Sequence, residues 1–194
     1  MLIEWNEKIN LTAITSPEEI AIKHFIDSLY GLKFLNGKKD VIDVGTGAGF
    51  PGVPLKIANP RIHLTLLDSL NKRLIFLEDV KEKLSLSDVE CIHSRAEDGA
   101  KCGSLLRENY DVAVSRAVAN LSCLCEYCLP YVKRGGVFLA YKGPDVEEDL
   151  ANAQNAIELL GGEVTGVFSY SIPPTDITHS IVVITKIKNT PEKY

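Results

Sequence analysis

Long apolar stretches are missing from this sequence of 194 residues. No run approaches the roughly 18 consecutive apolar residues that a membrane-spanning helix needs. The opening segment, MLIEWNEKIN, carries charges where a secretory signal peptide would have its apolar region. The sequence therefore predicts a cytoplasmic protein without a membrane partner.

An excess of positive charge is missing as well. The chain has 21 Lys and Arg residues against 26 Asp and Glu residues, which gives a formal net charge of -5. A protein that coats nucleic acid through its bulk charge has the opposite balance. Any contact with RNA must therefore come from a local group of basic side chains.

The cysteines show no disulfide pattern. There are five, an odd number in a chain without a secretory signal, which favours free thiols in a reducing compartment. Cys123, Cys125 and Cys128 form a cluster, but no second cysteine pair and no nearby histidine complete the ligands of a zinc site. Together with Leu121 and Leu124, Cys125 and Cys128 instead follow the spacing of a buried helical stripe. We expect a core helix here and no bound metal.

Apolar residues make up 45% of the composition, which is enough for one domain with a buried core. We expect a single domain over residues 1–194, in which an N-terminal helical segment, residues 1–36, packs on a Rossmann-like core, residues 37–194. The first helix of that segment has its apolar residues on one face: Leu2, Trp5 and Ile9. The second is predicted from about Pro17 to Tyr30, with a capping box formed by Ser16 and Glu19.

Beyond this segment, short β-rich runs alternate with helical runs, which is typical of a parallel sheet covered on both faces. Strands are expected at residues 40–44, 62–67, 89–93, 110–115, 135–141, 164–170 and 180–187. Helices are expected at residues 51–58, 71–84, 95–108, 119–132 and 145–160. The loop SIPPTD is too short for a crossover helix, so the last two strands must be antiparallel. An α/β sheet of about seven strands, mostly parallel with an antiparallel last strand, resembles the Rossmann-like class I methyltransferases.

The candidate chemistry begins after the first strand, in the run DVGTGAGFPG. Glycines at Gly45 and Gly47 let the chain turn sharply and bring bare backbone against a ligand. The spacing alone is ambiguous, because Gly47, Gly49 and Gly52 also satisfy the dinucleotide fingerprint. A tight turn without a ligand is the remaining alternative.

Three further positions extend this candidate site. Asp68 ends the second strand, 23 residues after Gly45, where a carboxylate can bind both ribose hydroxyls, although it could also cap the next helix. Ala96 and Glu97 follow the third strand, where an adenine would lie, and helix capping is again the alternative. Arg116 follows the strand at 110–115, beside the expected methyl group, and a surface role is its alternative.

Several motifs in order carry a family resemblance: NLTAI and HFIDS, then DVGTGAGFPG, LLDSLNKR, SRAED and SRAVA. Together they resemble the glucose-inhibited division protein B family, the bacterial small-subunit rRNA guanine-N7 methyltransferases, over nearly the whole chain. The resemblance implies methylation of N7 of one guanine in the 530 loop of 16S rRNA, with S-adenosylmethionine as methyl donor. It also implies cofactor contacts at Gly45, Phe50, Ala96, Glu97 and Arg116. Family members usually carry more helical residues before the position of Met1, so a shortened N-terminus is expected.

This chemistry needs no general base, because guanine N7 already carries an in-plane lone pair. The protein would contribute alignment of the two reactants, and the target base would have to leave its stack. We expect Arg116, Lys142, His24 and Asn10 to position the substrate, although His24 could equally be a packed surface residue. Other lysines and one arginine could bind phosphate or could simply be solvated: Lys23, Lys33, Lys38, Lys39, Lys133 and Arg134.

Two other functions remain open at this point. One is an NAD-dependent oxidoreductase, which the fingerprint permits but which lacks a substrate domain after the nucleotide-binding half. The other is a non-catalytic, S-adenosylmethionine-sensing rRNA-binding factor. For the leading hypothesis the expected partner is 16S rRNA or an assembling small ribosomal subunit, and the protein is expected to be a monomer.

Overall fold

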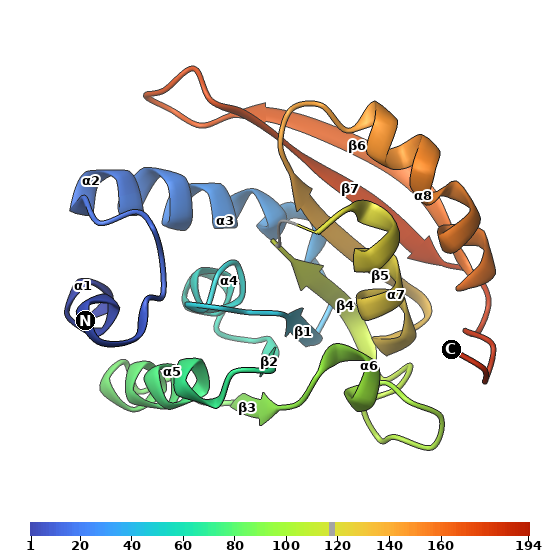
Figure 1. Ribbon diagram of the computed structural model, residues 1–194, viewed down its shortest axis with the longest axis horizontal. Coiled ribbons are helices and arrows are strands. Elements are labelled where there is room, and N and C mark those ends of the chain that lie inside the picture. The colour runs from blue at the N-terminus through green and yellow to red at the C-terminus, as the bar shows by residue number, and fades with distance from the viewer. Residues whose placement is uncertain (117–118) are drawn as a thin grey trace.

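A computed structural model describes residues 1–116 and 119–194. Within these residues the chain forms one seven-stranded sheet in the order β3-β2-β1-β4-β5-β7-β6 (Figure 1). The strands are β1 (Asp40–Val44), β2 (His63–Asp68), β3 (Val89–His93), β4 (Tyr110–Ser115), β5 (Val132–Lys142), β6 (Gly162–Ser171) and β7 (Thr178–Lys186). Each of them overlaps a strand expected from the sequence.

Strand direction confirms the expected fold class. Strands β1 to β5 pair in parallel, and β7 runs antiparallel to both of its neighbours, β5 and β6. Strand β2, which follows β1 in the chain, pairs with β1 on one side, and β4 pairs with β1 on the other side. This reversal of strand order places a crevice at the carboxyl ends of β1 and β4, where open α/β sheets bind ligands.

Helices cover both faces of the sheet, as expected (Figure 1). The helices of the core are α4 (Gly52–Ala58), α5 (Asn71–Lys83), α6 (Ala96–Gly99), α7 (Leu121–Cys128) and α8 (Glu147–Leu159). Successive residues of a strand point to opposite faces, and β1 divides the core in this way. Val41 belongs to the cluster that contains Leu77 of α5, whereas Ile42 belongs to the cluster that contains Cys128 of α7.

The cysteine-rich helix α7 is a core helix, as its spacing predicted. Leu121, Leu124, Cys125 and Cys128 are all at most 1% exposed. Burial raises the pKa of the Cys125 thiol to about 12, so this thiol stays protonated and unreactive at neutral pH. Across residues 1–116 and 119–194, no group of His, Cys, Asp or Glu side chains is placed to hold a metal ion.

The N-terminal segment contains two helical rods. The first is α1 (Leu2–Ile9), and the second is a continuous series made of α2 (Pro17–Ile20), the π-helix η1 (Ala21–Ile26), α3 (Asp27–Leu29) and the 3₁₀ helix η2 (Tyr30–Phe34). Trp5 of α1 donates a hydrogen bond of 2.9 Å to Asp79 of α5, which fixes α1 to the core. The division of the domain between residues 1–36 and 37–194 remains a prediction.

The predicted capping box at Ser16 is wrong. Ser16 occupies the N-cap position, but among the described residues its side chain makes no capping hydrogen bond. Glu19, the other half of the expected box, forms an ion pair with Lys23 one turn along the helix instead. The helix start therefore relies on Pro17 at the first helical position and on the backbone.

Two helix predictions are also too long. The helix expected at 95–108 ends at Gly99, because Gly103 adopts a left-handed φ of 82° and Ser104 Oγ donates back to the Gly99 carbonyl. The helix expected at 119–132 ends at Cys128, and Pro130 lies in a short 3₁₀ helix, η3 (Leu129–Tyr131), that leads into β5. None of the helices that the structure describes is long and apolar enough to cross a membrane.

Candidate active site

The glycine-rich loop leaves the carboxyl end of β1 in a conformation that only glycine adopts easily. Gly45 and Gly47 have φ values of 72° and 59°. A Cβ added to Gly45 would meet no atom within 4 Å, so its backbone borders open space. The loop therefore presents bare backbone at the crevice predicted from the strand order.

A cavity of about 320 Å³ opens beside this loop, within the range of small-molecule sites, which is roughly 300–1,000 Å³. Its walls come from the ends of β1, β2, β3 and β4, from the first turns of α5 and α6, and from α7 and a residue just before it: Val44, Gly45, Leu67, Asp68, Ser69, Arg73, Ser94, Arg95, Ala96, Glu97, Ser115, Ala119, Leu124 and Tyr127. The structure thus brings four of the predicted cofactor residues together, namely Gly45, Asp68, Ala96 and Glu97. Gly47, Phe50 and Arg116 are not in its walls.

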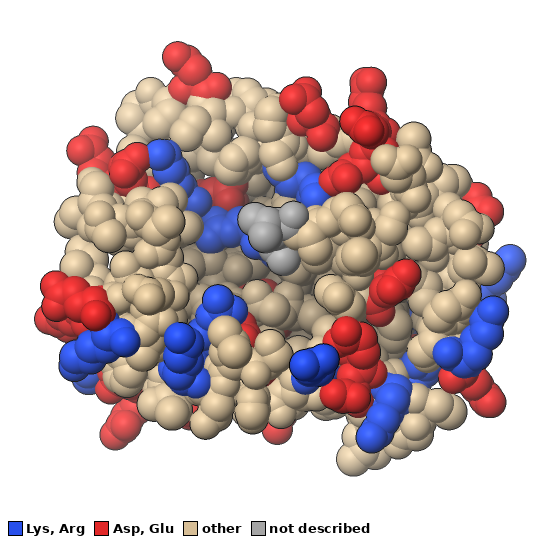
Figure 2. Space-filling model, viewed as in Figure 1, with Lys and Arg blue, Asp and Glu red and all other residues tan. Residues whose placement is uncertain are grey.

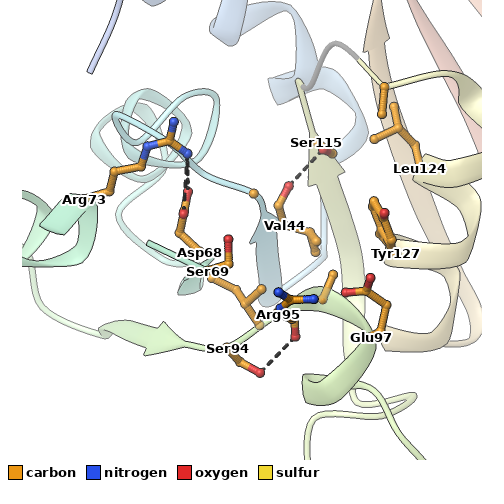
Figure 3. Close-up of a pocket in the computed structure, with 14 residues that line it drawn as sticks. Val44, Asp68, Ser69, Arg73, Ser94, Arg95, Glu97, Ser115, Leu124 and Tyr127 are labelled. Atoms are coloured by element: carbon orange, nitrogen blue, oxygen red, sulfur yellow. Dashed lines mark hydrogen bonds and ion pairs between the residues drawn. The ribbon is translucent and has the colours of Figure 1, made fainter. Parts of the chain in front are cut away.

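Asp68 is held at the cavity by its own chain. Its carboxylate is 2% exposed and accepts hydrogen bonds of 2.9 Å from the backbone N–H groups of Gly47 and Leu70. Arg73 forms an ion pair with the same carboxylate at 3.2 Å (Figure 3). Asp68 therefore orders both the glycine loop and the start of α5, the helix that the sequence suggested it could cap.

Arg73 is a site residue that the sequence analysis missed. Its position in the first turn of α5 was a signal, since a cation there is opposed by the helix dipole and needs an acidic partner. An ionised carboxylate accepts about four hydrogen bonds. Gly47, Leu70 and Arg73 occupy three of these positions, so a ligand that offers two hydroxyls to Asp68 would have to displace Arg73.

Asp43 is a second missed residue, and it lies under the glycine loop. Its fully buried carboxylate accepts hydrogen bonds of 2.8 Å from Thr46 Oγ1 and from the backbone N–H of Gly52. Among the described residues its other oxygen, Oδ1, has no partner. Burial raises the pKa of this carboxyl to about 6. The signal was an acidic residue inside the apolar strand VIDV.

The opposite wall of the cavity is built on the short helix α6. Ala96 and Glu97 form its first turn, whose backbone N–H groups have no partner within the helix. The Tyr131 hydroxyl donates to the Ala96 carbonyl at 2.7 Å and fixes this turn. Figure 3 shows Glu97 and Tyr127 on this side of the cavity, across from Asp68.

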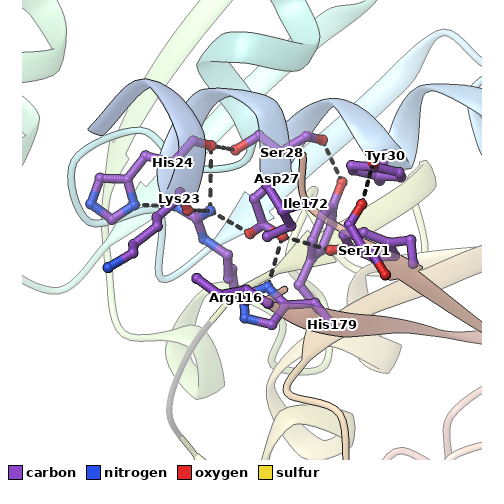
Figure 4. A network of polar contacts seen from close by, with 12 residues as sticks. Lys23, His24, Asp27, Ser28, Tyr30, Arg116, Ser171, Ile172 and His179 are labelled. Atoms are coloured by element: carbon purple, nitrogen blue, oxygen red, sulfur yellow. Dashed lines mark hydrogen bonds and ion pairs between the residues drawn. The ribbon is translucent and has the colours of Figure 1, made fainter. Parts of the chain in front are cut away.

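Arg116 lies just beyond β4 and reaches the second helical rod of the N-terminal segment, the one formed by residues 17–34 and called the N-terminal rod below. Its Nη1 pairs with the Asp27 carboxylate at 2.7 Å and donates to the Lys23 carbonyl at 3.1 Å (Figure 4). Its guanidinium lies over the Phe50 ring at 5.3 Å. Arg116 therefore joins Phe50 and His24 in a second group next to the cavity, and residues 117–118 of the SRAVA motif lie outside the described part of the chain.

His24 is held in one tautomer by its neighbours. Arg116 Nη2 lies 3.1 Å from His24 Nδ1, and an arginine can only donate, so Nδ1 must accept. The ring proton is then on Nε2, which donates to Thr12 Oγ1 at 2.8 Å. Burial and the nearby charge of Arg116 lower the pKa of His24 to about 4. Its ring also stacks on Phe50 at 4.7 Å, so His24 is neutral and packed at neutral pH.

The other two predicted substrate residues lie in different settings. Lys142 Nζ pairs with Asp149 at 2.7 Å and donates to the Ala119 carbonyl at 3.0 Å, so its charge is already partnered. Asn10 is exposed and ends α1 with a left-handed φ of 51°. Thr12, the partner of His24, follows it two residues later. On the face of the molecule that Figure 2 shows, Lys and Arg side chains are interspersed with Asp and Glu side chains around a central hollow.

Sequence comparison identifies similar proteins over the whole chain. The family model described as rRNA small subunit methyltransferase G matches residues 1–178. Proteins named ribosomal RNA small subunit methyltransferase G from Alkaliphilus metalliredigens and Clostridium perfringens are each 55% identical to this chain. Both alignments cover 100% of this chain and 82% of the relative.

Solved structures share the fold at much lower identity. A SAM-dependent O-methyltransferase from Thermotoga maritima superposes with a TM-score of 0.61 at 17% identity, over 99% of this chain and 73% of that one. TYW2 from M. jannaschii, solved in complex with AdoMet, gives a TM-score of 0.62 at 14% identity, over 83% of this chain and 77% of that one. These likenesses support the architecture derived above from strand order and direction.

Proposed function

Because this chain belongs to the rRNA small subunit methyltransferase G family, we propose that it methylates N7 of one guanine in the 530 loop of 16S rRNA. S-adenosylmethionine is the methyl donor in this proposal. The observation that carries it is the cavity between the glycine loop and α6, at the carboxyl ends of the strands. The resemblance of the sequence motifs and the family match both support the same reaction.

The residues around the cavity fit such a cofactor. The Asp68 carboxylate suits the ribose hydroxyls once Arg73 moves aside, and the first-turn N–H groups of α6 suit the adenine ring. Gly45 leaves room for the methionine part, because nothing lies within 4 Å of the point where its side chain would begin. When bound, S-adenosylmethionine supplies a methyl group activated on a positively charged sulfur.

The proposed reaction needs no general base, because guanine N7 already carries the lone pair that accepts the methyl group. Among the described residues, none of the four histidines lines the cavity. His24, which contacts Arg116 in the folded protein, is neutral, but its Nδ1 lone pair already accepts a hydrogen bond from Arg116. The contribution of the protein is therefore alignment, for which proximity and orientation can supply about 7 to 11 kcal/mol.

Arg116, His24, Lys142 and Asn10 are the proposed substrate-positioning residues. Arg116 is the best supported, since its guanidinium lies just beyond the end of β4 and is held by Asp27 of the N-terminal segment. We further propose that the protein acts as a cytoplasmic monomer on 16S rRNA or on an assembling small subunit. Lys142 would have to exchange Asp149 for phosphate in order to contribute.

Mass spectrometry of small-subunit rRNA tests the proposal directly. In cells that lack the protein, the 530 loop should lose one 7-methylguanosine, and the wild-type gene should restore it. The purified protein with S-adenosylmethionine should methylate unmodified 16S rRNA or small subunits from those cells. Binding of S-adenosylmethionine and RNA without any turnover would instead identify a non-catalytic sensing factor.

A further inference from the structure

The carboxylate of Asp27 connects three elements that are far apart in the sequence. It is 0% exposed, and its Oδ2 accepts the 2.7 Å hydrogen bond from Arg116. Its Oδ1 accepts hydrogen bonds from the Tyr170 hydroxyl at 2.7 Å and from His179 Nδ1 at 2.8 Å. One side chain of the N-terminal rod thus joins the end of β4 to the β6–β7 hairpin (Figure 4).

The backbone next to Asp27 is also arranged around Arg116. In an α-helix the Asp27 N–H would bond to the carbonyl four residues earlier, that of Lys23. Here the N–H of Asp27 bonds to the carbonyls of Ile22 and His24, at the end of the π-helix η1. The Lys23 carbonyl accepts from Arg116 at 3.1 Å. Such π turns occur frequently at functional sites.

The contacts of Asp27 keep a buried charge in place. Burial alone would raise the pKa of its carboxyl, but hydrogen bonds from His179, Arg116 and Tyr170 outweigh burial and hold the pKa below its ordinary value. Removing one partner of a buried ion pair leaves the other charge uncompensated. Without Asp27, the Arg116 guanidinium would keep its contacts with the Lys23 carbonyl and with His24 but would lose the anion that fixes its direction.

We propose that Asp27 is a positioning residue for Arg116, and that it couples Arg116 to the β6–β7 hairpin through Tyr170 and His179. Asp27 sets the orientation of the guanidinium against His24 and Phe50 at the edge of the active site. This inference rests on the proposed function, because the role of Arg116 toward the RNA is part of that proposal.

A double-mutant cycle on the single-turnover methylation rate tests the coupling. Asp27→Asn keeps the shape of the side chain and removes its charge, and it should lower the rate by about 10- to 100-fold, as expected for a misplaced aligning group. In the Arg116→Ala background the same substitution should have no further effect, because Asp27 acts only through Arg116. Equal losses in both backgrounds, or no loss in the wild-type background, would overturn the proposal.

Matched variants separate positioning from a general loss of stability. Glu108→Gln removes a carboxylate from another mostly buried ion pair, with Lys186, at the opposite end of β4, and it should leave the rate unchanged. Tyr170→Phe removes only one hydrogen bond to Asp27 Oδ1 and should lower the rate less than Asp27→Asn does. If Asp27→Asn does not fold, a Tyr170→Phe rate equal to wild type counts against the coupling.

A readout independent of activity distinguishes this inference from the proposed function. In nitrogen-15 NMR spectra of arginine side chains, the held guanidinium of Arg116 should show separate Nη signals. Asp27→Asn should merge them through faster rotation, whereas Glu108→Gln should not. Separate Nη signals with no rRNA methylation would contradict the proposed function but would support the coupling between Asp27 and Arg116. Merged Nη signals in the wild-type protein would refute the coupling itself.

Discussion

The carboxylate of Asp68 accepts a hydrogen bond of 2.9 Å from the backbone N–H of Gly47, which ties the end of β2 to the glycine loop after β1. The contact joins two adjacent parallel strands at the mouth of the cavity. A substitution at Asp68 therefore removes a ligand group and releases the loop at the same time. Both effects act in the same direction on cofactor affinity.

Asp68→Ala should weaken binding of S-adenosylmethionine by about 1.5 to 3 kcal/mol, the value of a hydrogen bond to a charged group. Isothermal titration calorimetry measures this loss. Asp176→Ala, which removes an exposed carboxylate from the β6–β7 loop, is the control and should bind normally. An Asp68→Ala variant with wild-type affinity would show that the ribose is bound elsewhere. Binding of NAD by the wild-type protein would contradict the cofactor assignment.

Methyl transfer should be nearly independent of pH between about 6.5 and 9. The pKa of His24 is about 4, so its ring stays neutral throughout this range, and guanine N7 has no proton to lose. Single-turnover rates measured across the range test this expectation. His24→Gln should slow transfer only through RNA placement, so saturating RNA should largely restore the rate, whereas Arg116→Ala should not be rescued. A steep rise near pH 7 that disappears in His24→Gln would establish a base.

The contribution of Asp43 to the free energy of unfolding should decrease as the pH rises through the titration range of this residue. Its folded pKa of about 6 lies above the ordinary value of 3.8, so between these two values the folded state binds more protons than the unfolded state. The free energy of unfolding therefore loses a contribution as pH rises through this window, by up to about 3 kcal/mol. Asp43→Asn should abolish that contribution.

Urea unfolding of the wild-type protein and of Asp43→Asn at about pH 4.5 and pH 6.5 measures the contribution of Asp43. It appears as a pH-dependent difference in the free energy of unfolding between the variant and the wild type. His24 contributes with the opposite slope, because its folded pKa lies below its ordinary value of 6.5. Its contribution is present above that value and is lost as pH falls toward about 4. A variant-minus-wild-type difference that does not change with pH would show that Asp43 remains ionised when folded.

Gly31→Ala should destabilise the protein by about 1 to 3 kcal/mol, the usual effect of overpacking. Gly31 packs directly under the Tyr141 hydroxyl, which donates to the Ser28 carbonyl at 2.8 Å, and an added Cβ would collide with that hydroxyl. Thermal unfolding monitors the change. In a Tyr141→Phe background the penalty for Gly31→Ala should shrink, and an undiminished penalty would place the strain elsewhere.

Affinity for small-subunit rRNA should decrease only moderately as the salt concentration rises. With the acidic net charge and with Lys23, Lys133 and Lys142 already paired to carboxylates, only a few phosphate contacts are available. The slope of log affinity against log salt should be on the order of −3, as for about four contacts. Filter binding between low and physiological salt measures it. A salt-independent affinity would exclude phosphate contacts by basic side chains.

The sequence predicted the sheet well because its strands are buried and strongly apolar. Val41 to Val44 show this, since all four residues are buried and their pattern stands out from the polar turns around them. The glycine loop was equally visible, because its chemistry is local. The helix predicted at 95–108 failed because the left-handed Gly103 and the hydrogen bond from Ser104 to the Gly99 carbonyl end a helix that composition alone allowed.

The Asp27 network could not be predicted in the same way. Its partners Arg116, Tyr170 and His179 lie 89, 143 and 152 residues away in the sequence. An acidic residue in a helix near the N-terminus looks like an ordinary surface residue until the tertiary fold buries it. Local periodicity carries no information about such contacts, so only the fold could reveal them.

The central pairing of β1 with β4 also has a consequence for how the chain reaches this fold. Ser115 Oγ donates to the Val44 carbonyl across a sequence separation of 71 residues, whereas β6 and β7 are joined by a short local turn. Closing a long loop costs more conformational entropy than closing a short one, and non-local pairings slow folding. The hairpin can therefore form early during folding, while the pairing of β1 with β4, two of the strands whose ends border the cavity, is the slow step. Because this pairing limits the folding rate, substitutions that weaken the contacts between β1 and β4 would slow folding itself, before any ligand is involved.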